Sequence, residues 1–228
     1  MDITFLGTGS SIGMPIVAFE HEGVNMDDPR NWRTRASLHV TMDGHPIQVD
    51  AGQEFRLQCL RENITDIQTF ILTHEHADHV LGMEDLRRYC TQNEQPLPIY
   101  SHAKGLQRVR EVYPYAITET PRHHGYAAFS LREVESQLAI EAGQVQFVSL
   151  PHGDMNTLGL IFEEQATGRR LAYYTDCKTV PDEAIEMAKG VDVAVLDALY
   201  FKPHRSHMSV DEAVDTAQKI GARVTYLT

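Results

Sequence analysis

Four side chains that commonly bind metals lie close together in the sequence. They are His74, His76, Asp78 and His79, and they form the pattern His-x-His-x-Asp-His. Imidazole nitrogen and carboxylate oxygen are the donors that zinc, manganese and iron accept in proteins. The alternative is a chance surface cluster, but a chain with 12 histidines in 228 residues is expected to contain this pattern far less than once. The pattern therefore predicts a metal site.

Two further candidate ligands stand where β-like runs end. His152 ends the run 147–152, and Asp176 ends the run 171–176. Taken alone, the histidine is more often a solvent-facing loop residue and the aspartate a turn former. Because both residues follow the His-x-His-x-Asp-His pattern along the chain, we interpret them as ligands.

The residues around these candidates predict alternating strands and helices. The helix that starts near 210 is the clearest, because Ser209 and Glu212 form a capping-box pattern and apolar residues then recur on one face. Polar candidates follow the strands, where loops held by a rigid sheet usually carry function. Residues 20–35 and 118–136 are expected to be irregular. Strands are expected at 3–6, 37–42, 46–49, 69–72, 145–150, 158–162, 170–175, 191–196 and 224–227, and helices from near 54, 80, 104, 181 and 210.

Composition limits the classes of function. A net charge of −12 disfavours a nucleic-acid partner, because neutralising phosphates needs a basic surface. The three cysteines are isolated in the sequence and predict no disulfide framework. We find no signal peptide and no apolar run of membrane-spanning length, so we expect a cytoplasmic protein with no membrane partner. The length suits one domain over residues 1–228.

The motif and the residues that follow it resemble the metallo-β-lactamase superfamily. This resemblance implies an α/β fold, the four-layer αββα sandwich of the metallo-β-lactamase fold. It also implies two divalent metal ions: His74, His76 and His152 would hold the first, Asp78 and His79 the second, and Asp176 would bridge them. Asp50, in the run Val49-Asp50-Ala51-Gly52, matches an aspartate that supports the ligands by hydrogen bonding.

The resemblance extends to a narrower group. It contains the accessory phosphodiesterase of the carbon–phosphorus lyase pathway, and it is similar to the transfer-RNA 3′-processing nuclease tRNase Z. The matching stretches are 5–11, 13–15, 28–31, 33–37 and 207–213. Many members carry zinc-binding cysteines where residues 16–26 have none, so we expect that structural zinc to be absent. Members also place a metal-binding histidine after a final strand like that ending at Thr228, so we expect the natural protein to continue.

These features predict a hydrolase, most simply a phosphodiesterase acting on a small or cyclic nucleotide-like phosphodiester. Two metals, Zn or Mn with Fe as a further option, would share a hydroxide that attacks phosphorus. Asp78 would accept a hydrogen bond from that hydroxide. His207 is the candidate general acid for the leaving group, with packing before the Ser209 cap as its alternative role.

Several alternatives stay open at this point. One is thioester hydrolysis of the glyoxalase II kind, although the chain has no room for that family's helical C-terminal domain. Another is a metal-bound sensor or binding module without catalysis. A true β-lactamase and an oxygen-reducing di-iron protein are disfavoured, the latter because such relatives carry Glu where His76 stands. A homodimer is left open.

Some basic residues have a weaker claim to the site. Arg33 and Arg35 could meet a substrate phosphate or pair within the chain, and Lys178 could touch substrate. The histidines that could line the pocket or its entrance are His123, His124 and His204.

Overall fold

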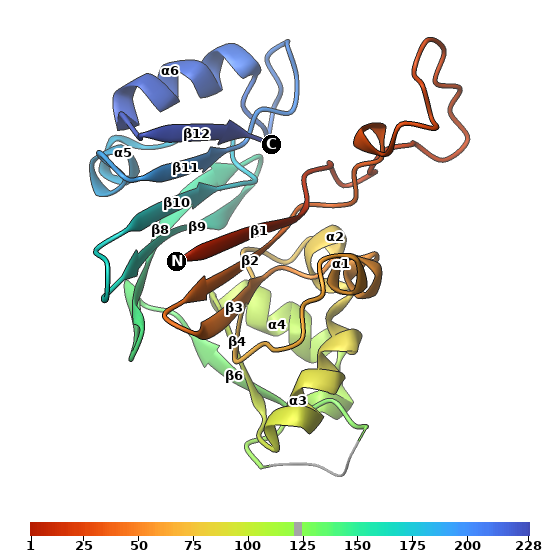
Figure 1. Ribbon diagram of the computed structural model, residues 1–228, viewed down its shortest axis with the longest axis vertical. Helices are drawn as coiled ribbons and strands as arrows, with labels where there is room; N and C mark the ends of the chain where they lie inside the picture. The colour runs from red at the N-terminus through yellow and green to blue at the C-terminus, as the bar shows by residue number, and fades with distance from the viewer. Residues whose placement is uncertain (121–124) are drawn as a thin grey trace. The chain divides into compact units, whose positions relative to one another are not determined.

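The computed structural model describes residues 1–120 and 125–228, which form two compact units. The N-terminal unit comprises Asp2–Thr41 and His45–Glu133. The C-terminal unit comprises Met1, Met42–Gly44 and Val134–Thr228. In Figure 1 the N-terminal unit is coloured from red through yellow to green, where β6 lies, and most of the C-terminal unit from green to blue; each contains a β-sheet with helices beside it.

The N-terminal unit is built on a six-stranded mixed sheet. In order across the sheet, its strands are β1 (Asp2–Gly7), β2 (Ser37–Met42), β3 (His45–Val49), β4 (Thr69–Ile71), β5 (Leu97–Ser101) and β6 (Phe129–Glu133). β1 and β2 are antiparallel, whereas β3, β4, β5 and β6 run parallel. Parallel neighbours need crossover connections, and helices supply them here. The carboxyl ends of β3 and β4 therefore meet at one edge, which carries Asp50 and His74.

Helices pack on this sheet through one apolar cluster. They are α1 (Phe55–Arg61), α2 (Ala77–Val80), η2 (Met83–Leu86), α3 (Arg87–Asn93), α4 (Ala103–Val112) and η3 (Pro114–Ala116), whereas η1 (Pro29–Asn31) has no buried residue and lies outside the cluster. Phe70 and Leu72, from β4 and the residue after it, join the same buried cluster as Phe55, Val80 and Leu106 of the helices. Burying an apolar side chain of this size contributes about 2 kcal/mol. The cluster holds α2, which carries Asp78 and His79, against the sheet.

The C-terminal unit contains a second six-stranded mixed sheet. In order, its strands are β12 (Val224–Leu227), β11 (Val193–Leu196), β10 (Arg170–Tyr174), β9 (Met155–Glu164), β8 (Gly143–His152) and β7 (Gln137–Ile140). β10, β11 and β12 are parallel, and β7 to β10 form an antiparallel meander. α5 (Asp182–Met187) and α6 (Val210–Ile220) pack on this sheet, with Ile185 and Ala213 in one buried cluster with Leu196.

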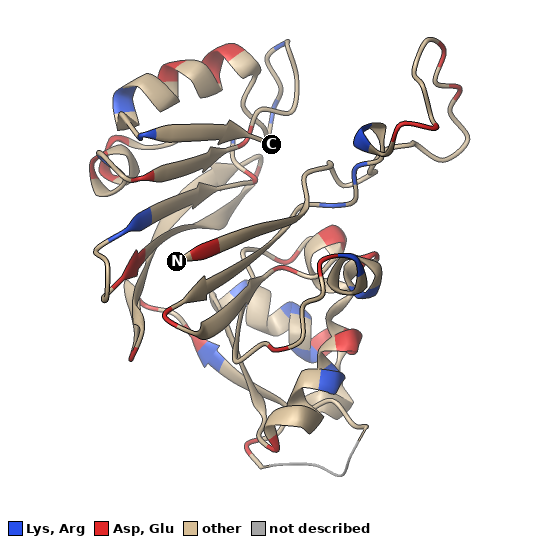
Figure 2. Ribbon diagram, viewed as in Figure 1, with Lys and Arg blue, Asp and Glu red and all other residues tan. Residues whose placement is uncertain are grey.

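The start of α6 is fixed by side chains close in sequence. Ser209 accepts from the backbone N–H of Glu212, and the Glu212 carboxylate accepts from the backbone N–H of Ser209. Figure 2 shows acidic residues at this end of α6 and a basic one at the other. The acidic residues of the first turn are Asp211 and Glu212, and the basic residue of the last turn is Lys219. This order complements the helix dipole. The cap therefore defines where the preceding loop, which contains His207, must end.

The expected strands all occur, and those at 37–42 and 224–227 have the predicted bounds. Two predictions were wrong in detail. α2 begins at Ala77 rather than near Val80, so Asp78 and His79 lie on a helix. Residues 118–136 are not wholly irregular, because they contain β6. The helix expected to begin near Pro181 is confirmed, because α5 begins at Asp182 with Pro181 as its N-cap. Within the described residues, no helix is both long and apolar enough to span a membrane.

Candidate functional site

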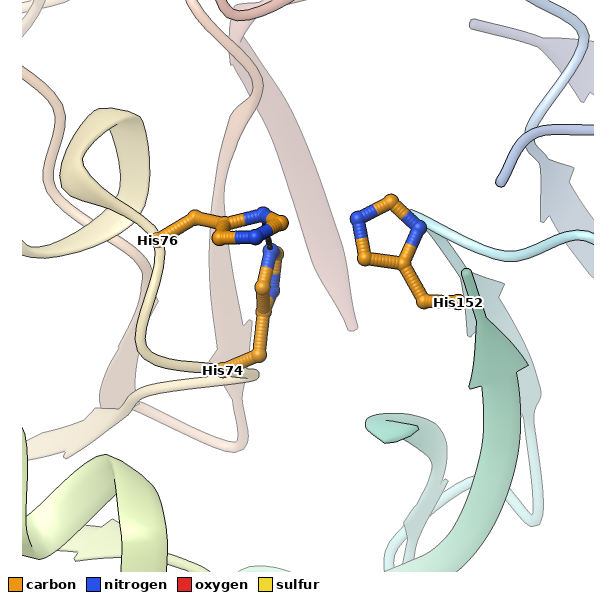
Figure 3. Close-up of side chains that lie close together, drawn as sticks. All are labelled: His74, His76 and His152. Carbon is orange, nitrogen blue, oxygen red and sulfur yellow. Dashed lines mark hydrogen bonds between the residues drawn. The ribbon is translucent and has the colours of Figure 1, made fainter. Parts of the chain in front are cut away.

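His74 and His76 lie in the loop that joins β4 to α2. His74 is buried, and His76 is the exposed N-cap residue of α2. Figure 3 shows the two rings edge to face, with Nε2 of His74 2.9 Å from Nδ1 of His76. Two nitrogens on one tetrahedral zinc lie about 3.3 Å apart, because each zinc–nitrogen bond is about 2.0 Å long. The distance between the two ring nitrogens is therefore close to that between two nitrogens bound to the same cation.

Thr73 determines which nitrogen of His74 carries the proton. Its hydroxyl donates to Oδ2 of Asp50 at 2.8 Å and lies 3.0 Å from Nδ1 of His74. Because the hydroxyl hydrogen is engaged by the carboxylate, the hydroxyl oxygen accepts the proton of Nδ1. The lone pair of His74 is therefore on Nε2, the nitrogen that faces His76.

The fully buried carboxylate of Asp50 does the same for His79. Nδ1 of His79 donates to Oδ2 of Asp50 at 2.8 Å, and the backbone N–H of Thr73 donates to Oδ1 at 2.8 Å. The proton of His79 therefore sits on Nδ1, and its lone pair is on Nε2. Ligating histidines need such a partner for their other nitrogen. One carboxylate fixes two predicted ligands, one directly and one through Thr73.

Asp78 adds an oxygen donor beside His79. Both residues are buried in α2, and Oδ2 of Asp78 lies 3.3 Å from Nε2 of His79. Both side chains belong to α2, which comprises only Ala77–Val80. Asp78 and His79 thus offer a neighbouring oxygen and nitrogen.

Two glycines allow α2 to approach the loop that carries Asp50. The backbone N–H of Gly82 donates to Ala51 O at 2.8 Å, and that of Ala51 donates to His79 O at 2.8 Å. A Cβ on Gly82 would lie 1.8 Å from Gly52 O, and one on Gly52 would lie 2.5 Å from Asp78 O. No side chain fits at either position without a shift of backbone. The contact between Asp50 and His79 therefore depends on this close approach.

His152 is the last residue of β8 in the C-terminal unit and is buried. Its Nδ1 lies 2.8 Å from the backbone carbonyl oxygen of Ser206. A carbonyl oxygen only accepts, so the proton is on Nδ1 and the lone pair is on Nε2. Figure 3 shows the His152 ring at the end of the β8 arrow.

Asp176 and His207 lie near His152 within the same unit. One potential ligand atom from each of the three side chains lies within 4.8 Å of the others. Asp176 comes just after the end of β10, and His207 precedes the α6 cap. The C-terminal unit thus brings together two predicted ligands and the predicted general acid.

Asp197 forms a hydrogen bond with His207 that was not predicted from the sequence. Nδ1 of His207 donates to Oδ2 of Asp197 at 2.6 Å, and the backbone N–H of Cys177 donates to the same oxygen at 2.8 Å. Burial raises the pKa of Asp197 to about 6, while the hydrogen bond from His207 acts in the opposite direction. The only sequence signal for Asp197 was its place just after a predicted strand, which β11 now provides.

Three of the weaker candidates have partners within the chain. Arg35 pairs with Glu54, and Arg33 donates to the Thr8 hydroxyl at 3.0 Å. Lys178 contacts both carboxylate oxygens of Glu212, at 2.6 and 2.8 Å.

The remaining weaker candidates are histidines. The ring of His204 lies 5.4 Å from that of His207, measured between centroids. His123 and His124 lie outside the described residues.

The donors in each unit fit a divalent transition metal. They are imidazole nitrogens and carboxylate oxygens, a set that suits zinc, manganese or iron. Cys177 follows the candidate ligand Asp176 directly in the sequence. Its thiol is fully buried, and burial raises its pKa, so the thiol stays protonated. The tautomers of His74, His79 and His152 each leave a lone pair on Nε2. The residues are therefore compatible with the implied metals.

Comparison with known proteins identifies the family. A model of the β-lactamase superfamily domain matches residues 45–228. This chain belongs to the metallo-β-lactamase superfamily. The predicted fold class, the α/β metallo-β-lactamase fold, is thereby confirmed. A solved structure described as a new diphosphatase from the PhnP family is 32% identical, with a TM-score of 0.87, and the match covers 99% of this chain and 85% of that one.

Two further relatives of this chain are named for two different activities. An Octanoyltransferase from Porphyromonas gingivalis is 32% identical over 97% of this chain, but the chain spans only 44% of that protein. A Ribonuclease Z from Bacillus velezensis is 25% identical over all of this chain and 87% of its own length. The predicted resemblance to phosphodiesterases and tRNase Z-like members of the superfamily is confirmed.

Proposed function

We propose that this protein is a dinuclear metal-dependent phosphodiesterase acting on a small or cyclic, nucleotide-like phosphodiester. The observation that carries the proposal is the hydrogen-bond arrangement at Asp50, which fixes the lone pairs of His74 and His79 on Nε2. A histidine that only packs has no need of it, whereas a metal ligand does. The likeness to a PhnP-family diphosphatase supports hydrolysis at phosphorus.

The proposed ligand assignment follows the arrangement of the family that the sequence resembles. His74, His76 and His152 would hold one metal and Asp78 and His79 the other, with Asp176 as a ligand shared between them. Contacts within each unit support it: the donors of α2 and its preceding loop are neighbours, as are those of His152 and Asp176. When bound, the metals would offset the phosphodiester's charge and bring the pKa of water toward neutrality.

His207 is proposed to protonate the leaving group. Hydrolysis adds a water oxygen to phosphorus and breaks the bond to the leaving oxygen, which must gain a proton. Because Nδ1 of His207 donates to Asp197, the transferable proton is on Nε2 when the ring is an imidazolium. The Asp197 carboxylate orients the ring and stabilises its positive charge. Asp78 is proposed to accept a hydrogen bond from the attacking water.

A thioester hydrolase is the second candidate. The relative of 32% identity named Octanoyltransferase is the observation that favours it. The same metal-ligand types serve thioester hydrolysis, and fold alone does not select between the substrates. The relatives named Ribonuclease Z favour RNA as a further substrate, whereas the negative net charge of the chain disfavours it.

The test combines metal analysis with a substrate panel. The chain is loaded with Zn or Mn, its metal content is measured, and it is assayed on cyclic and linear phosphodiesters, phosphate anhydrides, an RNA precursor and octanoyl thioesters. We expect phosphodiester hydrolysis that is lost on chelation and restored by metal. Activity on thioesters alone would overturn the proposal in favour of the second candidate. Metal binding without any hydrolysis would instead support a sensor or binding module.

A further inference from the structure

The loop between β11 and α6 carries aromatic side chains next to His207. It includes the run Tyr200-Phe201-Lys202-Pro203-His204. Tyr200 forms a bridge with Ser209, and the backbone N–H of Val210 donates to Tyr200 O at 2.8 Å. The backbone N–H of Leu199 donates to Oδ1 of Asp197 at 3.3 Å. The start of this run is thus attached to elements that also position the proposed general acid.

A row of rings extends from His152 along this loop. The centroid distance is 4.9 Å from His152 to His207, 5.4 Å from His207 to His204, and 4.9 Å from His204 to Tyr200. The planes of the last two pairs are inclined by 38° and 44°, whereas the first pair is close to perpendicular at 75°. Nδ1 of His204 accepts from the backbone N–H of Ser206 at 3.3 Å, which restrains that ring. The row therefore leads from the predicted ligand His152 toward the loop.

The outer part of the loop presents aromatic surface to solvent. Phe201 is 88% exposed and Tyr200 is 45% exposed. Lys202 follows them in the sequence and has no ion-pair partner within residues 1–120 and 125–228, whereas Arg205 is paired with Asp154. Exposed rings beside a cation suit a ligand that is planar at one end and anionic at the other.

We propose that Tyr200, Phe201 and His204 form a stacking platform for a planar ring carried by the leaving alcohol. The substrate is then a phosphodiester whose leaving group bears a nucleobase or a similar aromatic ring. This inference rests on the proposed function, because it takes His207 as the acid that reaches the leaving oxygen. His204 and Tyr200 continue the row of rings beyond His207, so a ring bound there belongs to the leaving group.

A matched pair of substrates separates the ring from the phosphodiester. Adenosine 2′,3′-cyclic phosphate carries a base, and the 2,3-cyclic phosphate of methyl riboside carries the same strained phosphodiester without one. For the metal-loaded protein we expect Phe201→Ala and Tyr200→Ala to raise KM for the adenosine compound about tenfold, with kcat nearly unchanged. We expect both variants to hydrolyse the methyl riboside compound as the unmodified protein does.

Two further variants test whether the effect belongs to the platform. Tyr200→Phe keeps the ring and should restore the adenosine KM. Phe19→Ala removes a ring that is 62% exposed in the N-terminal unit and should change neither substrate. Equal losses on both compounds, or no loss on adenosine, would refute the platform.

A binding measurement distinguishes failure of the platform from failure of the proposed function. By calorimetry, the unmodified protein should bind adenosine 5′-monophosphate more tightly than ribose 5-phosphate, and Phe201→Ala should abolish the difference. If neither cyclic phosphate is hydrolysed but this preference exists, the phosphodiesterase proposal fails and the platform stands. If hydrolysis occurs without the preference, the platform fails and the proposed function stands.

Discussion

Oδ2 of Asp50 accepts a hydrogen bond from Nδ1 of His79 across 2.8 Å, although the two residues lie 29 positions apart. The same oxygen accepts from the Thr73 hydroxyl, which in turn contacts His74. Two predicted ligands thus share one buried anion. This arrangement gives Asp50 a larger role than any single hydrogen bond, because it orients two rings and fixes both tautomers.

Replacing Asp50 with Asn should therefore weaken metal binding. The amide can donate as well as accept, so the protons of His74 and His79 are no longer held on Nδ1. We expect zinc affinity, measured by competition with a chelator, to fall about 10- to 100-fold. Thr73→Val, which removes only the link to His74, should cause a smaller loss. Unchanged zinc affinity in Asp50→Asn, with circular dichroism showing a folded protein, would contradict this role.

Asp176 is expected to be needed for metal retention. Asp176→Ala removes the proposed bridging carboxylate, so most bound metal and activity should be lost. Elemental analysis after gel filtration, with turnover measured on the same sample, checks this. Glu141→Ala, which alters an exposed carboxylate, is the control and should keep its metal. A variant at position 176 with two metals and full turnover would show that the ligand assignment is wrong.

His207 is expected to matter most when the leaving group is poor. His207→Ala should slow hydrolysis of an alkyl phosphodiester about 100-fold or more, and that of a nitrophenyl ester far less, because nitrophenolate departs without protonation. Asp197→Asn should show the same pattern more weakly, since it acts through His207. The measurement is kcat on both esters. Equal losses on the two esters would exclude the general-acid role.

Glu164 is expected to make stability depend on pH. Its buried carboxylate accepts from the Met1 ammonium at 2.6 Å, and this hydrogen bond, with one from Thr167, lowers the pKa of Glu164 to about 2. A lowered pKa contributes stability above the unfolded pKa, near 4.5, that is lost as pH falls toward 2. Glu164→Gln should thus cost about 2 kcal/mol at pH 7 and progressively less below pH 4.5.

Urea unfolding across that pH range checks this prediction, with Glu141→Gln as the control for an exposed carboxylate. A Glu164→Gln deficit that is the same at pH 3 and pH 7 would point to packing instead of charge.

Gly82 is expected to tolerate no side chain. A Cβ there would lie 1.8 Å from Gly52 O, so Gly82→Ala must displace α2 from the loop of Asp50. We expect a loss of about 1–3 kcal/mol in unfolding free energy together with weaker zinc binding. Gly44→Ala serves as the comparison, since open space surrounds Gly44 but its φ is +81°; it should lose stability without losing metal affinity. Equal zinc affinity in both variants would contradict the prediction.

Local signals in the sequence predicted much of the fold. The start of α6 followed from Ser209 and Glu212, because a capping box is made by residues three apart. β5 was not predicted, because Pro98 stands within it and proline lacks the N–H that a strand needs. In the structure β5 still pairs with both β4 and β6, so pairing with neighbours outweighs the local signal.

Some features of the candidate site could likewise be predicted from the sequence, and others could not. Ligand types could be identified from the spacing of His74, His76, Asp78 and His79, since that spacing is a property of one short segment. The hydrogen-bond partner of His207 could not be identified from the sequence. The contact between His207 and Asp197 arises only when the loop after β11 folds back to α6. Likewise, nothing in the sequence indicates that the carbonyl of Ser206 lies beside His152.

That last contact has a consequence for tolerance to mutation. The proton on Nδ1 of His152 is held by a main-chain oxygen, which every amino acid possesses, whereas those of His74 and His79 depend on the side chain of Asp50. In a deep mutational scan, position 206 should therefore accept many residues, and position 50 almost none. The orientation of His152 is therefore tolerant of substitution at its partner, while the orientations of His74 and His79 both depend on one side chain.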